Sequence, residues 1–410
     1  MTRHQADVVV LGAGSAGIAA AVAAARNGRT VIVIDKNGFC GGTATTALVG
    51  TICGLFHRST SSPVEYACSG FAREFSERLQ KKSNTTIVSA TEGLFFLPYE
   101  VESFKELCLE LLDEEKITFF DSSVCMSVEK DGDKIISLMF EQKGLQINVQ
   151  ATSFVDATGE AEISVQSQAE LLPEGPRQAN AYVFVLEGVE DMEMRKLQLT
   201  LIKTIKQGIY SKQLDKDCER LTIVPGSYTE GKISFKLGLP LGEITEKELS
   251  TRVEKIVHFL SCELPAFKEV SIAERASQIG VRSGRRPVGL QVLCEEDVLN
   301  CQKFENGVVN APWPMEEWLG GLKPTMTYFA QRDHYQIPSP VLISKKFNNL
   351  FFAGKSISAT NKAIASARVM GTCLGTGFAA GTMAAFSSQG LALTEAVKEI
   401  RKEQVLNVSN

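Results

Sequence analysis

Closely spaced metal and redox ligands are absent from the sequence. Its 410 residues include only four histidines, and the ten cysteines form no CxxC pair. Structural zinc sites and dithiol redox sites need such spacings, so we expect neither a metal ion nor a disulfide relay. Unpaired thiols are typical of a reducing compartment, which indicates a cytoplasmic protein with mostly buried cysteines.

An excess of positive charge is also missing. Lys and Arg total 43 against 48 Asp and Glu, and the formal charge is −5. A nucleic-acid surface requires clustered cations, so no nucleic-acid partner is expected. No membrane partner is expected either, because the apolar segment 18–25 is short and the segment 363–386 is broken by glycines and Arg368. The first expected strand begins at residue 6, so no signal peptide is expected. The sequence gives no indication of an oligomeric state.

The sequence does contain a glycine-rich turn near its start. An apolar run at 6–11, typical of a buried parallel strand, leads into Gly12, Gly14 and Gly17 in the pattern GxGxxG. The first glycine permits a tight turn, the second lets the backbone approach a pyrophosphate, and the third lets the following helix pack closely. Asp35 ends the next strand, where its carboxylate can accept hydrogen bonds from a ribose. This turn predicts a dinucleotide site for NAD or FAD.

The apolar pattern divides the chain into three parts. Residues 1–172 continue with a helix and an antiparallel meander, residues 173–334 mix strands with amphipathic helices, and residues 335–410 return to an apolar strand and a small-residue helix. The predicted fold is α/β: a discontinuous Rossmann-type domain with an inserted α+β substrate domain. The expected strands are 6–11, 30–34, 124–128, 135–140, 145–149, 153–155, 179–186, 232–237, 308–311 and 349–353. The expected helices are 18–27, 101–115, 192–207, 246–262, 363–386 and 393–403.

Further segments resemble flavoproteins of the glutathione-reductase-like superfamily. They are the acid and glycine pair in 35–43, the Val-Asp-Ala-Thr-Gly element at 155–159, the strand at 349–354 and a glycine-rich helix start at 375–381. The resemblance implies FAD as the cofactor, with the helix dipole facing the flavin and stabilising its reduced anion. With the glycine turn included, the predicted cofactor contacts are Gly12, Gly14, Ser15, Ala16, Gly17, Asp35, Lys36, Gly42, Thr43, Val124, Ala157, Thr158, Gly159, Gly354, Gly377 and Phe378.

A narrower resemblance connects the chain to oxidoreductases related to the fumarate reductase flavoprotein. It is carried by residues 43–45, 279–286, 335–338 and 357–370. Two positions depart from that group's pattern: Ser283 stands where Glu is usual, and Asn361 stands where His is frequent. Either departure implies altered substrate contacts or lost activity.

Several related reactions are disfavoured by missing features. Residues 43–47 contain no cysteine pair for a dithiol relay, and Trp313 and Trp318 do not form the paired-tryptophan motif of flavin halogenases. Lys355 follows Gly354 where aromatic hydroxylases of the p-hydroxybenzoate type carry Asp. No second glycine motif exists for a dedicated NAD(P)H domain. We therefore expect a small-molecule substrate that visits the flavin directly.

Four residues are candidates for the chemistry. Arg368 and Arg285, the latter grouped with Arg282 and Arg286, are suited to bind an anionic substrate. Pairing with interface carboxylates or FAD phosphates is the alternative, and it is favoured for Arg286. His334 and Tyr335 are candidates to move a proton.

Other side chains near the expected flavin carry weaker hypotheses. His57 is a second histidine candidate. Cys40 and Cys53 flank the glycine pair, where a covalent flavin link is an alternative to packed thiols. The expected reaction is hydride transfer between a small anionic substrate and flavin N5, with dehydrogenation favoured. Reduction of an activated double bond and flavin binding without turnover are the alternatives.

Overall fold

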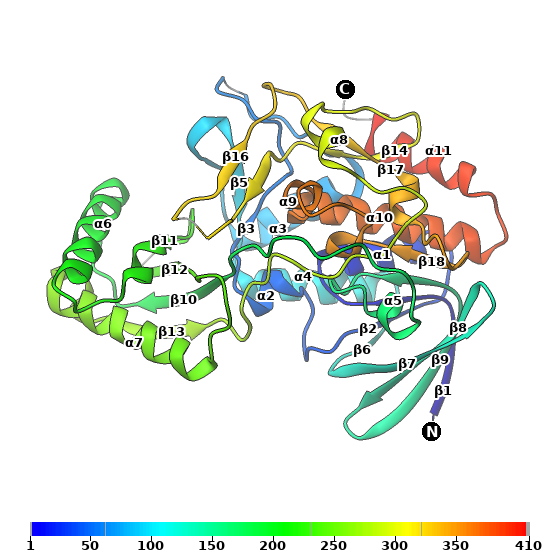
Figure 1. The fold of residues 1–410 in the computed structure, drawn as a ribbon, viewed down its shortest axis with the longest axis horizontal. Helices are drawn as coiled ribbons and strands as arrows, with labels where there is room; N and C mark the ends of the chain where they lie inside the picture. Colours follow the sequence, from blue (N-terminus) through cyan, green and yellow to red (C-terminus); the bar gives the residue numbers. More distant parts are fainter. Residues whose placement is uncertain (1, 62, 230, 321, 407–410) are drawn as a thin grey trace.

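The computed structural model describes residues 2–61, 63–229, 231–320 and 322–406. They form a large α/β body and a smaller lobe to one side, which Figure 1 shows in green at the left. No helix within these ranges is both long and apolar enough to cross a membrane.

The large body is built on a seven-stranded sheet with the order β6-β2-β1-β9-β8-β7, and β18 also pairs with β9. Strands β1 (Thr2–Leu11), β2 (Val31–Ile34), β6 (Thr118–Phe120), β9 (Leu145–Asp156) and β18 (Leu350–Phe352) run parallel, while β7 (Ser123–Asp131) and β8 (Lys134–Gln142) form an antiparallel meander with β9. The apolar run of β1 is buried on both faces, because Val8 and Val10 belong to one core and Val9 and Leu11 to another.

One strand prediction is wrong. The sequence predicted separate strands at 145–149 and 153–155, whereas β9 is continuous. Its pairing with β1 runs from Thr2–Ile147 to Leu11–Asp156. The polar residues between the two predicted strands stay in the strand because they also pair with β1 in this parallel ladder.

Helices α1 (Ser15–Arg26) and α10 (Met370–Ser388) pack against each other over the sheet (Figure 1). Their backbones approach closely: a Cβ built on Gly377 would lie 2.1 Å from the Ala16 carbonyl oxygen, and one on Gly381 would lie 2.1 Å from that of Ala20. The long predicted helix 363–386 is divided into α9 (Ala363–Ala367) and α10. The predicted helix start at 375 is wrong, because α10 begins at Met370. The other helices of this body are α2 (Thr43–Thr46), α3 (Gly70–Ser83), α4 (Val101–Glu114), α5 (Glu162–Gln166), α8 (Glu295–Leu299) and α11 (Leu393–Gln404).

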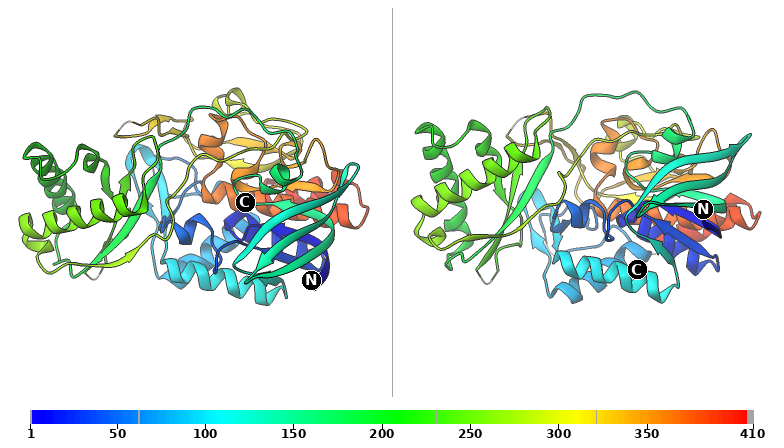
Figure 2. Two further views of the ribbon diagram at one scale, coloured as in Figure 1. Left: turned by 60° about the horizontal axis from the view of Figure 1, so that its bottom comes forward. Right: turned by 90° about the horizontal axis from the view of Figure 1, so that it is seen from below.

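The small lobe is a four-stranded antiparallel sheet in the order β11 (Leu221–Ile223), β12 (Lys232–Gly238), β10 (Ala181–Glu187), β13 (Ser271–Arg275). Helices α6 (Met194–Tyr210) and α7 (Glu246–Glu263) cover the face turned away from the large body (Figure 2). α7 starts with a capping box, in which Thr245 and Glu248 satisfy each other's backbone donors.

Three further short sheets complete the large body. They are β14 (Gly307–Ala311) with β17 (Tyr335–Pro338), β15 (Met315–Glu317) with β16 (Thr325–Thr327), and β3 (Thr51–Ile52) with β5 (Phe95–Pro98) and β4 (Val88–Ser89). The β14–β17 sheet packs on α10 and α11. The hydrophobic core of the small lobe contains Leu48 and buried residues between Tyr182 and Ala276. Val308 and Ile337 belong instead to the core of the large body that contains Val8 and Val10. The domain boundaries at 172 and 334 stay a prediction.

Candidate functional site

Three backbone turns meet at the carboxyl ends of the parallel strands. They follow β1 at Gly12, precede α2 at Gly42, and follow β9 at Ala157. Gly12 has φ +103°, and a Cβ there would lie 2.7 Å from the Ala157 carbonyl oxygen. A Cβ on Gly42 would lie 2.9 Å from the Cα of Gly14, and the Gly41 amide donates to the Ala13 carbonyl at 2.8 Å. These approaches exclude side chains and leave bare backbone at the start of α1, as a bound pyrophosphate requires.

Asp35 ties this turn to the end of β2. One carboxylate oxygen accepts from the Ala13 amide at 2.5 Å, and the other accepts from the Asn37 amide at 2.8 Å. Burial raises the pKa of Asp35, and these hydrogen bonds oppose that effect. Lys36 is exposed, and Val124 lies half-exposed one residue beyond Ser123, whose amide donates to the Asp35 carbonyl at 2.8 Å. The predicted ribose acceptor thus also anchors the glycine turn.

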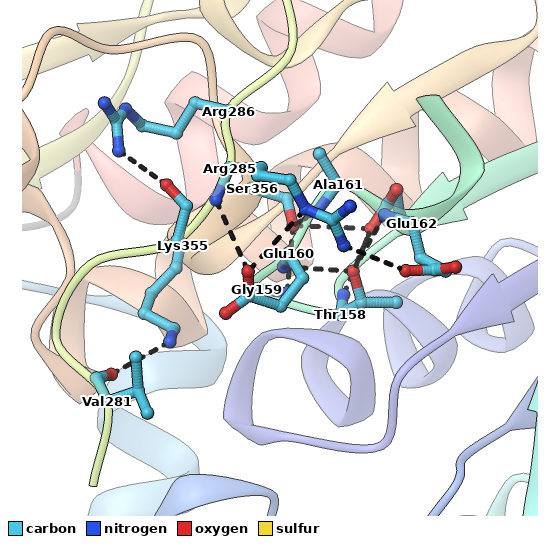
Figure 3. A network of polar contacts seen from close by, with 12 residues as sticks. Thr158, Gly159, Glu160, Ala161, Glu162, Val281, Arg285, Arg286, Lys355 and Ser356 are labelled. Atoms are coloured by element: carbon cyan, nitrogen blue, oxygen red, sulfur yellow. Dashed lines mark hydrogen bonds and ion pairs between the residues drawn. The ribbon is translucent and has the colours of Figure 1, made fainter. Parts of the chain in front are cut away.

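The turn after β9 is held by Asp156, which the sequence analysis did not single out. Its carboxylate accepts from the Thr158 hydroxyl at 2.7 Å, the Thr158 amide at 3.1 Å and the Ile163 amide at 2.8 Å. The Ser356 hydroxyl accepts from the Gly159 amide at 2.9 Å (Figure 3). Burial raises the pKa of Asp156. A carboxylate directly after an apolar strand was the available signal for this role.

Lys355 lies over the same turn. A Cβ on Gly159 would lie 2.8 Å from the Lys355 Cε, and the Lys355 ammonium donates to the Val281 carbonyl at 3.0 Å (Figure 3). Burial lowers the pKa of Lys355. A cation therefore stands beside the dinucleotide turns, one residue after Gly354, whose φ of +65° favours glycine.

Gly377 and Phe378 differ from their predicted place at a helix start. Both lie inside α10, where Gly377 contacts α1 and the Phe378 ring stacks on Phe71 at 5.9 Å. The helix start lies at Met370, and the Gly371 amide donates to the Cys53 carbonyl at 2.9 Å. Gly377 and Phe378 serve helix packing in this structure.

Two of the predicted arginines have partners within the protein. Arg285 contacts Glu162 at 3.3 Å and Glu160 at 3.9 Å (Figure 3). Buried Arg286 donates to the carbonyls of Ala359 and Gly284 at 2.7 Å and to the Asn361 side chain. Arg285 thus pairs with carboxylates, as the alternative describes, whereas Arg286 donates to neutral oxygens. A role of Arg285 as an anion ligand stays a prediction.

Arg368 instead belongs to a cluster at the junction of the large body and the small lobe. Its guanidinium donates to the carbonyls of Arg282 at 3.3 Å and Glu316 at 3.1 Å. The Arg282 guanidinium lies 4.2 Å from the Trp318 ring centroid, and the Lys236 ammonium lies 5.4 Å from it. The Glu316 carboxylate accepts from both indole N–H groups, at 2.9 Å and 3.1 Å. We call these side chains the junction cluster: Lys236, Arg282, Trp313, Glu316, Trp318 and Arg368.

The two proton-transfer candidates lie in different surroundings. Tyr335 is fully buried, its hydroxyl donates to the Ser366 hydroxyl at 2.9 Å, and burial raises its pKa further above the ordinary value. The His334 ring lies 5.5 Å from the His57 ring, and burial lowers the pKa of His334 to about 4. Tyr335 is joined through the Ser366 hydroxyl to the Trp313 carbonyl, and His334 lies beside His57. A role of either side chain in proton transfer stays a prediction.

The cysteines near the glycine pair behave as packed thiols. Cys40 is buried and Cys53 is half-buried, and burial raises the pKa of Cys40 to about 12. A thiol with such a pKa is protonated at neutral pH and is a poor nucleophile. This agrees with the expectation of packed thiols over a covalent link.

Comparisons with known proteins bear on this site. Solved structures of similar fold include a geranylgeranyl bacteriochlorophyll reductase-like protein from Thermoplasma acidophilum (12% identity, TM-score 0.50, 98% of this chain and 83% of that one). Another is CabE, an aromatic hydroxylase from angucycline biosynthesis (10%, TM-score 0.52, 97% and 65%). A third is the OxyS anhydrotetracycline hydroxylase from Streptomyces rimosus (11%, TM-score 0.50, 97% and 65%). At these identities the likeness shows the fold alone.

The curated proteins contain no match to this sequence. A family profile described as FAD dependent oxidoreductase matches residues 7–405, nearly the whole chain. The turns that expose backbone at the start of α1 fit the dinucleotide of that cofactor. The chain belongs to the family of FAD-dependent oxidoreductases.

Proposed function

We propose that this oxidoreductase transfers hydride between a small anionic organic substrate and N5 of the flavin, with dehydrogenation of the substrate as the favoured direction. The observation that supports this most strongly is the junction cluster. Three of its side chains are cations, and within the described ranges none of them lies within 4.0 Å of a carboxylate oxygen. A cluster of this kind at a domain junction is suited to bind an anion.

The chain's own residues would bind the cofactor at the dinucleotide turns and the substrate at the neighbouring junction cluster. Backbone amides at Gly14 and Ser15 would hold the dinucleotide phosphates, and Lys355 would add positive charge beside them. Bound FAD supplies the hydride acceptor of the reaction. Arg368 and Arg282 would orient the anionic group of the substrate, and the hydrogen bond from Lys355 to the Val281 carbonyl connects the two places.

We also propose that the chain is related to flavoproteins of the glutathione-reductase-like superfamily that resemble fumarate reductase. This rests on residues 279–286 and 357–370, which the structure locates around the turns and the junction cluster. Residues 173–334 would form the substrate domain. The same cluster would also serve the reverse reaction, reduction of an activated double bond conjugated to an anionic group.

Anaerobic absorption spectroscopy tests this function. The purified protein should carry a flavin band that a small organic anion bleaches on mixing, without any nicotinamide nucleotide. Gly12→Val is the matched control, because its side chain would collide with the Ala157 carbonyl and remove the cofactor. A tightly bound flavin that no small anion reduces, and that no unsaturated anion reoxidises, would instead identify a flavin-binding protein without turnover.

A further inference from the structure

We propose that the junction cluster binds an organic carboxylate with a flat, conjugated or aromatic body, held jointly by Lys236 of the small lobe and by Arg282 and Arg368. This inference rests on the proposed function, because it names the substrate class and the binding residues of the same site. Lys236 was not among the residues that the sequence pattern singled out.

The position of Lys236 follows from the alternation of its strand. In β12, Ile233, Phe235 and Leu237 are fully buried in the core beneath α6 and α7, so Lys236 lies on the opposite face. Both views in Figure 2 show that this face is turned toward the large body. Lys236 therefore enters the junction from the small lobe, whereas Arg368 lies in the large body, between α9 and α10.

The charges in the cluster do not balance. Glu316 is its only carboxylate, and both Glu316 oxygens already accept from indole N–H groups. Arg282 donates to the Ala179 carbonyl, and Arg368 donates to the carbonyls of Arg282 and Glu316, all of which are neutral acceptors. Three cations and one carboxylate thus leave two positive charges in excess at a half-buried place.

This excess is costly without a ligand. Burial lowers the pKa of Lys236, and so does the neighbouring Arg282, while Glu316 and Cys53 oppose the shift. Burial and the proximity of Arg368 likewise lower the pKa of Arg282, to about 9. An anion bound among these groups would relieve the repulsion and replace lost hydration.

The aromatic side chains indicate the body of the ligand. The Trp318 ring already packs against Arg282, and the Trp313 ring lies 5.6 Å from the Phe96 ring. Trp313 is itself buried, so the half-buried rings of Trp318 and Phe96 offer the aromatic surface. Such surface beside guanidinium groups suits a flat molecule that carries a carboxylate better than a bare inorganic anion. Phosphate charge has its own cation at Lys355, over the dinucleotide turn.

Tryptophan fluorescence of the FAD-loaded protein tests the inference directly, because the chain's only two tryptophans both belong to the cluster. The probes are benzoate, its neutral analogue benzamide, and inorganic phosphate. Benzoate should change the emission saturably, and benzamide and phosphate should bind at least about tenfold more weakly. Lys236→Met should weaken benzoate binding by about tenfold or more, because it removes one charge-assisted hydrogen bond.

Lys232→Met is the matched control, since Lys232 lies exposed at the start of the same strand and should leave benzoate affinity unchanged. Equal affinity for benzoate and benzamide, or an unchanged affinity in Lys236→Met, would overturn the inference. So would phosphate binding as tightly as benzoate. Flavin spectra separate this result from the proposed function. Benzoate binding to a protein whose flavin no small anion reduces and no unsaturated anion reoxidises would refute turnover and keep the site. Flavin bleaching by neutral substrates alone, without benzoate binding, would refute the site and keep turnover.

Discussion

At the scale of single residues, Asp156 shows how a buried charge shapes the cofactor site. It sits at the end of β9 with no exposed surface, and its oxygens accept from amides and hydroxyls on both sides of the Ala157–Thr158–Gly159 turn. A carboxylate is needed here because one side chain must satisfy several donors at once. The same residue thus ends the strand and fixes the backbone that approaches the dinucleotide.

Replacing Asp156 should therefore cost more than replacing any one of its donors. Asp156→Ala leaves the Thr158 and Ile163 amides without their acceptor and should lower the free energy of unfolding by about 3 kcal/mol. Ser356→Ala, which removes one hydroxyl from the same network, should cost about 1 kcal/mol. Urea unfolding of the FAD-free proteins measures both, and equal losses would contradict the argument.

His334 should make stability depend on pH. Its pKa is lowered to about 4 by burial, and by Lys303 and His57, while an ordinary histidine titrates near 6.5. Between these values the unfolded chain binds more protons, so the free energy of unfolding should fall by on the order of 1–3 kcal/mol as pH drops from 6.5 toward 4. In His334→Gln this loss should shrink, whereas exposed His258→Gln should retain it. Thermal melts at pH 7 and pH 5 would show the difference.

At the scale of elements, the contact between α1 and α10 depends on two glycines. A methyl group at Gly377 would meet the Ala16 carbonyl oxygen at 2.1 Å, and backbone cannot move aside as a side chain can. Gly377→Ala should cost about 2–3 kcal/mol and weaken FAD retention, because α1 carries the glycine turn. Gly375→Ala in the same helix meets side-chain atoms rather than backbone, Val309 at 2.8 Å and Gln404 at 3.5 Å, and should cost less. Calorimetric melting temperatures of both variants test this order.

The elements also show what the sequence could predict. The glycine turn, Asp35 and most helices follow from local patterns, because periodicity and glycine spacing are local properties. Continuous β9 and the start of α10 at Met370 depend on partners far along the chain. The roles of the arginines also depend on distant partners. The sequence does not distinguish Arg285 from Arg368, yet only Arg285 pairs with Glu160 and Glu162. Lys236 was missed because its neighbours come from other segments.

At the scale of the whole molecule, carboxylate binding across the junction should weaken at alkaline pH. Burial and Arg282 lower the pKa of Lys236 below the ordinary lysine value, so Lys236 loses its charge at a lower pH than an ordinary lysine does. Benzoate affinity should therefore be constant near neutrality and fall above it. Lys236→Arg should extend the constant range to higher pH, because guanidinium is the stronger base. An identical alkaline loss in both proteins, measured by tryptophan emission, would assign the titration to another group.

The connection that leaves the small lobe after β13 has a mechanical consequence. Within a few residues it supplies the Val281 carbonyl to Lys355, places Arg282 on Trp318, and carries Arg285 and Arg286 to partners in the large body. A rotation of the small lobe that tightens around a ligand would pull on this one segment. The displacement would be transmitted to Lys355 through its hydrogen bond to the Val281 carbonyl. Binding of a ligand at the junction would therefore shift this cation relative to the dinucleotide turn.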